Sequence, residues 1–232
     1  MKLIVIDTET SDLPERGGSM IELAWITLAS PDWKPTSSYE KYIQYSGPIS
    51  VTAQAQNHIR ADRLTEKYGA VLREQAIMAL LNEVEPDSFL VAHNSDFDSK
   101  FLPELKNPWI CTYRVSKCIW PEAPGHSNQV LRYWLDIEPD LSIAANIKQR
   151  APHQALYDVA TTVGILQKML TRHTPAELNQ MTSQPRLLRC IEFGKHKGTE
   201  FKDIPRDYLV WLRGQPVLDT DLRYTLDSIL HG

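Results

Sequence analysis

The chain has 232 residues, of which 42% are hydrophobic and 23% charged, and its formal net charge is −4. This composition suits one ordinary globular domain with a modest appendage and excludes a disordered chain. The N-terminal apolar run is too short for a signal peptide and no later stretch could span a membrane, so we expect a cytoplasmic protein.

Charge is unevenly distributed along the chain. Residues 1–171 hold 16 Lys and Arg against 21 Asp and Glu, whereas residues 183–232 hold 8 against 7. Because proteins that grip long duplexes usually have a basic surface, this balance disfavours extensive duplex binding. It allows an enzyme that holds a single strand end, where metal ions supply the positive charge.

The first third of the chain predicts strands followed by a helical tract. Residues 3–6, 20–29 and 39–45 are β-branched or apolar runs and indicate three successive strands. A helical tract is expected from about residue 52 to residue 83, where apolar residues recur near the 3.6-residue period.

Strands and helices then alternate. Residues 88–92 indicate a buried strand, and Asn94 or Ser95 is expected to cap a helix that Pro103 interrupts. This order predicts an α/β fold with a mixed sheet covered by helices. The later elements are a short strand at 109–112, a helix capped by Ser127 that runs through Trp134, and a long helix from Pro152 to Leu170.

The composition divides the chain into three parts. Residues 1–171 form the expected catalytic domain. Residues 172–185 turn polar and contain Pro175 and Pro185, which indicates a linker or a bridging helix. The remaining residues 186–232 are short for an independent core, so we expect them to lean on the main domain.

Asp7 and Glu9 stand two residues apart at the end of the first predicted strand. Alternate residues of a strand point to the same face, so both carboxylates can bind one metal ion. Neighbouring carboxylates repel unless a hard cation such as Mg²⁺ or Mn²⁺ compensates their charge. The alternative is a strand end whose acids simply face water.

Two further segments carry candidate site residues. Residues 93–98 enter a helix after an apolar strand, which places Asp98 in its first turn, where an acid can also merely complement the helix dipole. His153 and Asp158 are five residues apart, about 140° around a helix. We therefore expect His153 at or before the first turn and Asp158 facing inward. The alternative for His153 is a capping or surface residue.

Three segments resemble, in order and spacing, the motifs of the DnaQ-like (DEDDh) exonucleases. They are Asp7-Thr-Glu-Thr-Ser-Asp-Leu13, Ala92-His-Asn-Ser-Asp-Phe-Asp98 and His153-Gln-Ala-Leu-Tyr-Asp158. The resemblance covers residues 1–171 and implies a ribonuclease H-like fold, with a five-stranded mixed sheet flanked by helices. The tail from Phe193 to Gly198 is similar to the C-terminal segment of one bacterial member.

By this resemblance, four carboxylates hold two Mg²⁺ ions, which Mn²⁺ can replace, and His153 is the general base. In such sites the two ions stabilise the attacking and the leaving oxygen, and water attacks the last phosphodiester to release a 5′-mononucleotide. The implied metal ligands are Asp7, Glu9, Asp98 and Asp158.

Nucleic-acid contacts are expected around this site and in the tail. Leu13 can wedge against the terminal base pair or pack in the core, and Ile59 can contact the terminal base. Family members often carry a histidine where this chain has Asn57. Lys195 and Lys197 form a basic turn that either approaches phosphates or is simply solvated. The expected contacts are Thr8, Thr10, Leu13, Ile59, Asn94, Lys195 and Lys197.

Together these features predict a metal-dependent 3′-to-5′ exodeoxyribonuclease of DNA repair or recombination, acting on single-stranded and duplex 3′ ends. One alternative is an RNA-trimming exoribonuclease, because nothing in the sequence tests for a 2′-hydroxyl. Another is a nucleic-acid-binding module that kept the fold and lost catalysis. The expected partners are DNA 3′ ends, or RNA in the alternative, and no membrane.

Overall fold

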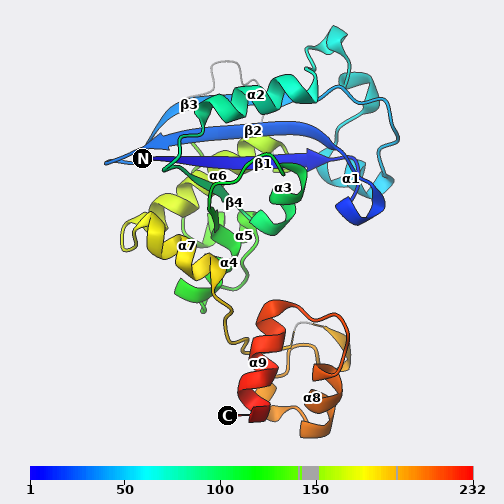
Figure 1. Cartoon of the computed structure of the whole chain (residues 1–232), viewed down its shortest axis with the longest axis vertical. Coiled ribbons are helices and arrows are strands. Elements are labelled where there is room, and N and C mark those ends of the chain that lie inside the picture. The colour runs from blue at the N-terminus through cyan, green and yellow to red at the C-terminus, as the bar shows by residue number, and fades with distance from the viewer. Residues whose placement is uncertain (141, 143–151, 192, 232) are drawn as a thin grey trace. The chain divides into compact units, whose positions relative to one another are not determined.

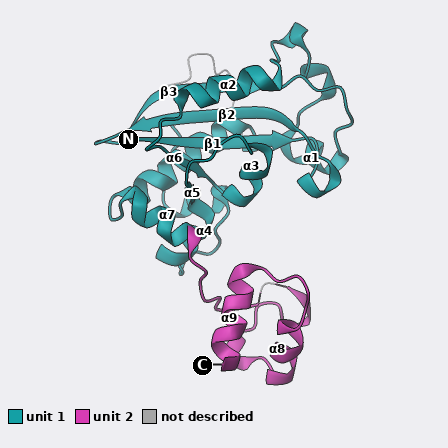
Figure 2. Cartoon of the chain, viewed as in Figure 1, with its two compact units in different colours: residues 1–182 teal, residues 183–232 magenta. Residues whose placement is uncertain are grey.

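A computed structural model describes residues 1–140, 142, 152–191 and 193–231 (Figure 1). The chain separates into two compact units, residues 1–182 and residues 183–232 (Figure 2). Among the described residues, none of the helices combines the length and the apolar character needed to cross a bilayer.

Unit 1 is built on a five-stranded mixed sheet, as the family resemblance implied, and its strand order is β3-β2-β1-β4-β5. The first three strands are antiparallel, and β4 and β5 extend the sheet in parallel with β1. The third strand begins earlier than predicted, because a polar edge strand lacks the apolar pattern that would reveal it. The strands are β1 (Lys2–Thr10), β2 (Met20–Ala29), β3 (Lys34–Tyr42), β4 (Phe89–Ala92) and β5 (Trp109–Cys111).

Helices cover both faces of this sheet. Figure 1 shows α2 along one face, while α6 packs on β1 and β2 from the other. The helices of unit 1 are α1 (Val51–Asn57), α2 (Arg73–Glu83), α3 (Ser95–Phe101), α4 (Thr112–Ile119), α5 (Asn128–Trp134), α6 (Ala155–Leu170) and α7 (Pro175–Ser183).

The helical tract predicted from about residue 52 to residue 83 consists of α1 and α2 with a connection between them that is not α-helical. The chain leaves α1 at His58, which has a left-handed φ of 59°, and makes two short 3-10 turns before α2. Gly69, with a φ of 82°, ends the second of these turns. The apolar positions that suggested a helix lie mostly in the second half of this segment. The periodicity therefore predicted α2 and gave no information about the residues before it.

Side chains of β1 alternate between two cores. Leu3 and Val5 pack in the core that contains residues of α6, whereas Ile4 packs in the core that contains residues of α2. Because alternate residues share a face, Asp7 and Glu9 continue the row that faces α6. The strand β1 thus directs the carboxylates of Asp7 and Glu9 toward α6, the helix that carries Asp158.

The segment 172–185, predicted as a linker or bridging helix, contains α7, which buries Leu178 in the same core as α6. Unit 2 contains α8 (Arg206–Arg213) and α9 (Thr220–His231). It has an apolar core of its own, which its short length did not predict. The buried core residues are Ile191, Phe201, Ile204, Leu209, Leu212, Leu222 and Leu226.

Gly164 of α6 provides a test of this packing. A Cβ on Gly164 would lie 2.4 Å from Cγ2 of the buried Ile137. Alanine gains about 1 kcal/mol of helix propensity over glycine, but overpacking a core typically costs about 1–3 kcal/mol. We therefore expect Gly164→Ala to lower the unfolding temperature of unit 1, as measured by calorimetry.

The control for this substitution is the double variant Ile137→Ala/Gly164→Ala. Since Ile137→Ala removes the clashing methyl group, adding Gly164→Ala to it should cost nothing or stabilise. Equal losses in the two backgrounds would contradict the predicted contact.

Candidate active site

Three carboxylates converge at the C-terminal end of β1. One ligand atom from each of Asp7, Glu9 and Asp158 lies within 4.8 Å of the others. Asp7 and Glu9 come from β1, and Asp158 comes from the first turn of α6. Closely spaced carboxylate oxygens are the ligands that hard divalent cations prefer, so this cluster fits such a cation.

Two neighbours fix the carboxylate of Asp158, which is 8% exposed. The backbone N–H of His153 donates to Oδ2 at 2.8 Å, and Nε2 of Gln129 donates to Oδ1 at 3.2 Å. His153 has a left-handed φ of 66° and lies just before α6, with its side chain exposed. His153 therefore precedes the helix while Asp158 faces inward, the arrangement expected from their spacing.

Asp98 lies beside the cluster but is not one of its three members. It is 3% exposed in the first turn of α3. Its Oδ1 accepts from both the backbone N–H of Thr8 at 3.1 Å and the hydroxyl of Thr8 at 2.9 Å. Thr8 points away from the Asp7 row on β1, so these bonds tie the tip of β1 to α3. Asp96, in contrast, is exposed.

Burial and repulsion raise the pKa of these acids. The pKa of Asp7 lies well above its ordinary value because its carboxylate is partly shielded from water and close to Asp98. Burial and the charge of Glu22 raise the pKa of Glu9 to about 9. The pKa of Asp158 is also raised by burial. Acids packed this closely take up protons unless a cation replaces them.

Burial also raises the pKa of Asp98, to about 7. The two hydrogen bonds from Thr8 act in the opposite direction, because they stabilise the charged form. The tie between β1 and α3 therefore favours an ionised Asp98.

Glu22 is a buried acid of this site that the sequence analysis did not identify. It lies opposite Glu9 in the register of β1 and β2 and is 4% exposed. Its Oε2 accepts from the backbone N–H of Ala155 at 3.2 Å, at the start of α6. An acid inside the otherwise apolar strand at 20–29 was the available signal, because such a charge needs a partner.

Asn57 is a second residue of this site that the sequence analysis did not identify as a site residue. Its Nδ2 donates to the carbonyl of Thr10 at 3.1 Å, and its hydrogen bond to Glu9 partly lowers the raised pKa of that acid. Its Oδ1 accepts from the N–H of Ile59 at 3.0 Å. The polar contact to Glu9 and to the end of β1 thus comes from Asn57.

The predicted contact of Ile59 with a terminal base is not supported by its position. Ile59 is 4% exposed and packs with Ile21 and Leu64. It lies outside the lining of the cleft around the cluster. Its side chain therefore completes a small core beneath the cleft rim.

An open cleft of about 710 Å³ surrounds the carboxylates. Leu13, 47% exposed, and Asn94, which is exposed with a φ of 82°, lie on its rim together with His153. Thr8 and Thr10 also line it, although they are 5% and 8% exposed. Further lining residues are Asp12, Arg16, Ser50, Thr52, Gln56, Phe97, Ser127, Asn128 and Gln129.

His93 lies in the cleft wall but is fully engaged. Its Nδ1 lies 2.9 Å from the hydroxyl of Thr112, and its Nε2 lies 2.9 Å from the carbonyl oxygen of His126. Burial lowers the pKa of His93 to about 4, so the ring is neutral at physiological pH. His93 thus connects the end of β4 to α4, and His153 is the histidine with an open side chain.

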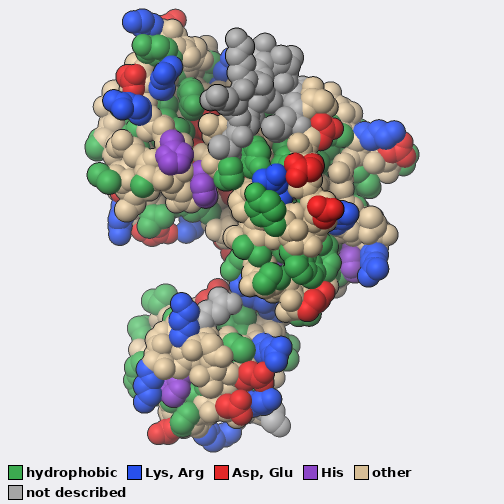
Figure 3. Space-filling model, turned by 180° about the vertical axis from the view of Figure 1, so that it is seen from behind, with side chains coloured by type: hydrophobic (Ala, Val, Ile, Leu, Met, Phe, Trp, Pro, Cys, Tyr) green, Lys and Arg blue, Asp and Glu red, His purple; other side chains and the backbone are tan. Residues whose placement is uncertain are grey.

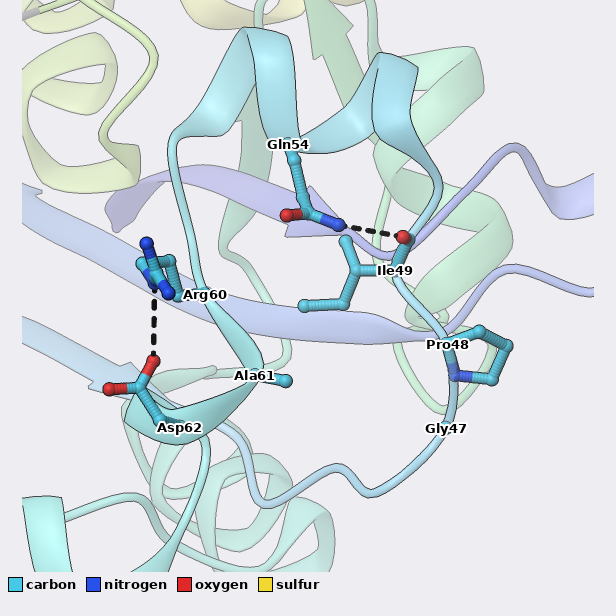
Figure 4. A pocket seen from close by; sticks show the side chains of 7 residues that line it. All are labelled: Gly47, Pro48, Ile49, Gln54, Arg60, Ala61 and Asp62. Atoms are coloured by element: carbon cyan, nitrogen blue, oxygen red, sulfur yellow. Dashed lines mark hydrogen bonds and ion pairs between the residues drawn. The ribbon is translucent and has the colours of Figure 1, made fainter.

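A second hollow of about 600 Å³ lies beside α1 (Figure 4). In it, Arg60 pairs with Asp62 at 3.6 Å, and Nε2 of Gln54 donates to the carbonyl of Ile49 at 2.9 Å. Its polar side chains are thus engaged locally, and the acidic cluster lies elsewhere.

Positively charged side chains occur in both units of the chain. On the face seen in Figure 3, Lys and Arg side chains are scattered among acidic and apolar ones and form no continuous basic band. Lys195 and Lys197 belong to unit 2. Among the residues that line the cleft, Arg16 is basic, and its guanidinium lies 3.9 Å from the carboxylate of Asp12.

The chain is similar to known nucleases along most of its length. A family model described as Exonuclease matches residues 4–166. Exodeoxyribonuclease 10 of Escherichia coli strain K12 is 28% identical over 236 residues, with 99% of both chains covered. The PolC-type DNA polymerase III of Bacillus subtilis strain 168 is 28% identical over 177 residues, covering 72% of this chain and 11% of the polymerase.

Solved structures of nucleases are also similar to this chain. Exonuclease X in complex with 5′-overhanging duplex DNA is 26% identical, with a TM-score of 0.62, and the match covers 78% of this chain and 99% of that one. The nuclease domain of 3′hExo, a DEDDh family member bound to rAMP, is 20% identical, with a TM-score of 0.56 and coverage of 73% and 92%. The predicted ribonuclease H-like fold is confirmed.

The raised pKa values predict a pH-dependent metal affinity. Without metal, protonation of these acids favours the folded state. Folding stability therefore falls as the pH rises through their raised pKa values, which are about 7 for Asp98 and about 9 for Glu9. Because a cation must replace those protons, Mn²⁺ should bind more tightly, and raise the unfolding temperature more, at pH 9 than at pH 6.

Calorimetry in two buffers of different ionisation enthalpy checks this expectation. Binding near neutral pH should release protons to the buffer. An affinity that is the same across this pH range, with no proton release, would contradict the electrostatic account of the cluster.

The hydrogen bond from Gln129 to Asp158 provides a second test. Gln129→Leu removes the donor while keeping much of the side-chain volume. Loss of an outer partner of a metal ligand typically costs about 10- to 100-fold in metal affinity or activity, and we expect a loss in that range. Isothermal titration with Mn²⁺ measures it, and Val130→Ala on the same helix is the control. Unchanged affinity in Gln129→Leu would show that Asp158 is positioned without this bond.

Proposed function

Because the chain belongs to the exonuclease family whose model matches residues 4–166, we propose that it removes nucleotides from the 3′ ends of DNA. The observation that carries this proposal is the convergence of Asp7, Glu9 and Asp158 in an open cleft. A cluster with raised pKa values, open to a substrate, is typical of a catalytic site rather than of a structural ion pair.

Divalent metal ions are part of this function. The family implies them, and the three converging carboxylates fit them because repulsion among the carboxylates helps to raise the pKa values of Asp7 and Glu9. We propose Mg²⁺ as the physiological ion, with Mn²⁺ able to replace it. Asp7, Glu9 and Asp158 would hold the metal, and Asp98 would support it from beside the cluster. When bound, such ions stabilise the charge that develops on the attacking and leaving oxygens.

The chain's own residues would then orient water and receive its proton. We propose that the imidazole of His153, exposed at the cleft, takes a proton from the attacking water. The water oxygen bonds to phosphorus, and the bond to the 3′-oxygen of the preceding nucleotide breaks. That oxygen takes up a proton from solvent and becomes the new 3′-hydroxyl, while a 5′-mononucleotide leaves. The backbone N–H of His153 holds Asp158 at 2.8 Å, so the base is anchored beside the carboxylates.

Rim residues would hold the terminal nucleotide. Leu13, with 47% of its surface exposed, offers an apolar face to the terminal base. Asn94 presents a side-chain amide that makes no cap hydrogen bond with α3. Thr8 and Thr10 are largely buried, so they would contact the strand mainly through the backbone.

DNA is the favoured substrate because the full-length relative is an exodeoxyribonuclease and the 26% identical structure holds duplex DNA. We propose a role in DNA repair or recombination, on single-stranded and duplex 3′ ends. The RNA alternative is tested with matched DNA and RNA oligonucleotides.

Product analysis tests polarity, substrate and metal together. With Mg²⁺, 3′-labelled DNA should release a labelled mononucleotide at once, whereas 5′-labelled DNA should shorten stepwise. Chelation by EDTA should stop both reactions. A faster reaction on the matched RNA would select the exoribonuclease, and cleavage that persists in EDTA would exclude the proposed chemistry.

Matched substitutions test the acidic cluster. Asp158→Asn should lower the rate at least about a thousandfold, a loss of about 4 kcal/mol of transition-state stabilisation. Asp96→Asn, at an exposed acid two residues from Asp98, should leave the rate within about twofold. Since Asp158 has a raised pKa, its neutral replacement should not destabilise the fold, which thermal unfolding checks. An unchanged rate in Asp158→Asn would show that the measured cleavage does not come from this cluster, as the non-catalytic alternative requires.

A further inference from the structure

Unit 2 exposes large apolar side chains although it has a core of its own. On α8, Leu209 and Leu212 are buried, at 2% and 3% exposed. Val210 and Trp211 of the same helix are 55% and 57% exposed. Since Leu209 and Leu212 already fill the buried side of α8, the exposed tryptophan is surplus to the folding of this unit and available for a ligand.

A tight turn places two lysines next to this helix. Gly194 and Gly198 have left-handed φ values of 66° and 84° and frame the turn, which is closed by a hydrogen bond from the N–H of Lys197 to the carbonyl of Gly194 at 3.2 Å. A Cβ on Gly194 would lie 3.5 Å from the hydroxyl of Tyr208. The turn therefore packs against α8 and presents Lys195 and Lys197 beside it.

Aromatic contacts connect the turn to Trp211. The rings of His196 and Tyr208 are 4.5 Å apart with an interplanar angle of 66°, and those of Tyr208 and Trp211 are 5.3 Å apart at 42°. Tyr208 and Trp211 stand one helical turn apart on α8. Trp211 is thus supported on one side while more than half of its surface stays open to solvent.

Lys195 and Lys197 differ from half of the Lys and Arg residues of this unit. Neither has an ion pair with any residue that the structure describes, and both are exposed. Four other basic side chains are paired with acids, namely Arg186–Asp221, Arg189–Glu200, Lys202–Glu200 and Arg213–Asp227. Uncompensated positive charge thus lies beside the open aromatic ring.

We propose that one surface of unit 2, hereafter the tail surface, binds single-stranded nucleic acid. The tail surface consists of Lys195, His196, Lys197, Tyr208 and Trp211. The lysines would contact successive phosphates, and Trp211 would stack on an unpaired base. A duplex hides its base faces within the stack, so an open ring flanked by cations fits a single strand. The choice of DNA as the strand rests on the proposed function. The 99% coverage of exodeoxyribonuclease 10 means that this relative also has residues matching unit 2.

The two kinds of contact have different signatures. Each phosphate contact to a single strand adds about 0.7 to the slope of log affinity against log salt, so two lysines should contribute about 1.4. Base stacking on an aromatic side chain is independent of salt, and its loss should weaken binding roughly 5- to 150-fold.

The experiment uses the full chain with Asp7→Asn, which keeps the labelled strand intact. Fluorescence anisotropy follows binding of a long oligothymidylate between about 50 and 200 mM salt. Adding Lys195→Gln/Lys197→Gln should weaken binding and lower the slope by about 1.4. Trp211→Ala should weaken binding with the slope unchanged.

Matched controls come from the same unit. Lys202→Gln removes an exposed lysine that Glu200 already pairs, and Tyr224→Ala removes an aromatic ring of α9 that is 45% exposed. Both should leave affinity and slope unchanged. Because the substituted tail-surface side chains are exposed, thermal unfolding should be the same in all variants.

The outcomes separate this inference from the proposed nuclease function. Cleavage of labelled DNA by the wild-type chain is measured in parallel and tests the active site alone. If the wild type cleaves DNA but the lysine and tryptophan variants bind as tightly as their parent, the tail surface does not bind the strand, and a protein partner becomes the explanation for its exposed ring. If the variants weaken binding as expected while cleavage is absent, the inference stands and the proposed function fails.

Discussion

The repulsion among the clustered carboxylates at the end of β1 is the constraint on which the rest of unit 1 depends. Asp7, Glu9 and Asp158 lie within 4.8 Å of one another, and their pKa values are raised. Such a group would separate if the elements carrying it could move apart. It is held because β1 is the central strand of the sheet and α6 packs directly on it, so the folding free energy of a whole core opposes the repulsion.

Hydrogen bonds around the cluster also hold several of its acids in place against this repulsion. Thr8 fixes Asp98 to β1 with two bonds, and Glu22 accepts from the start of α6. His153 and Gln129 each hold one oxygen of Asp158. Asp98, Glu22 and Asp158 are therefore positioned before any cation arrives, and such preorganisation reduces what a ligand must reorder on binding.

Much of this could be predicted from the sequence, where pattern and chemistry coincide. The alternation of β1 placed Asp7 and Glu9 on one face, and the five-residue spacing placed His153 before the helix of Asp158. What failed depended on contacts between distant segments. The break at His58, the burial of Ile59 and the role of Asn57 arise from packing that no local period reveals. Glu22 looked like one polar residue in an apolar strand until the register set it opposite Glu9.

Because His153 has a left-handed backbone, the role of its N–H bond to Asp158 and the role of its imidazole ring can be tested separately. A φ of 66° is unfavourable for most side chains but readily adopted by glycine. His153→Gly should therefore keep the N–H bond to Asp158 while deleting the ring. Free imidazole added to that variant could then occupy the space left by the side chain, so that chemical rescue would report on proton transfer alone. Valine at the same position would disturb both contributions, because a β-branched residue resists this conformation.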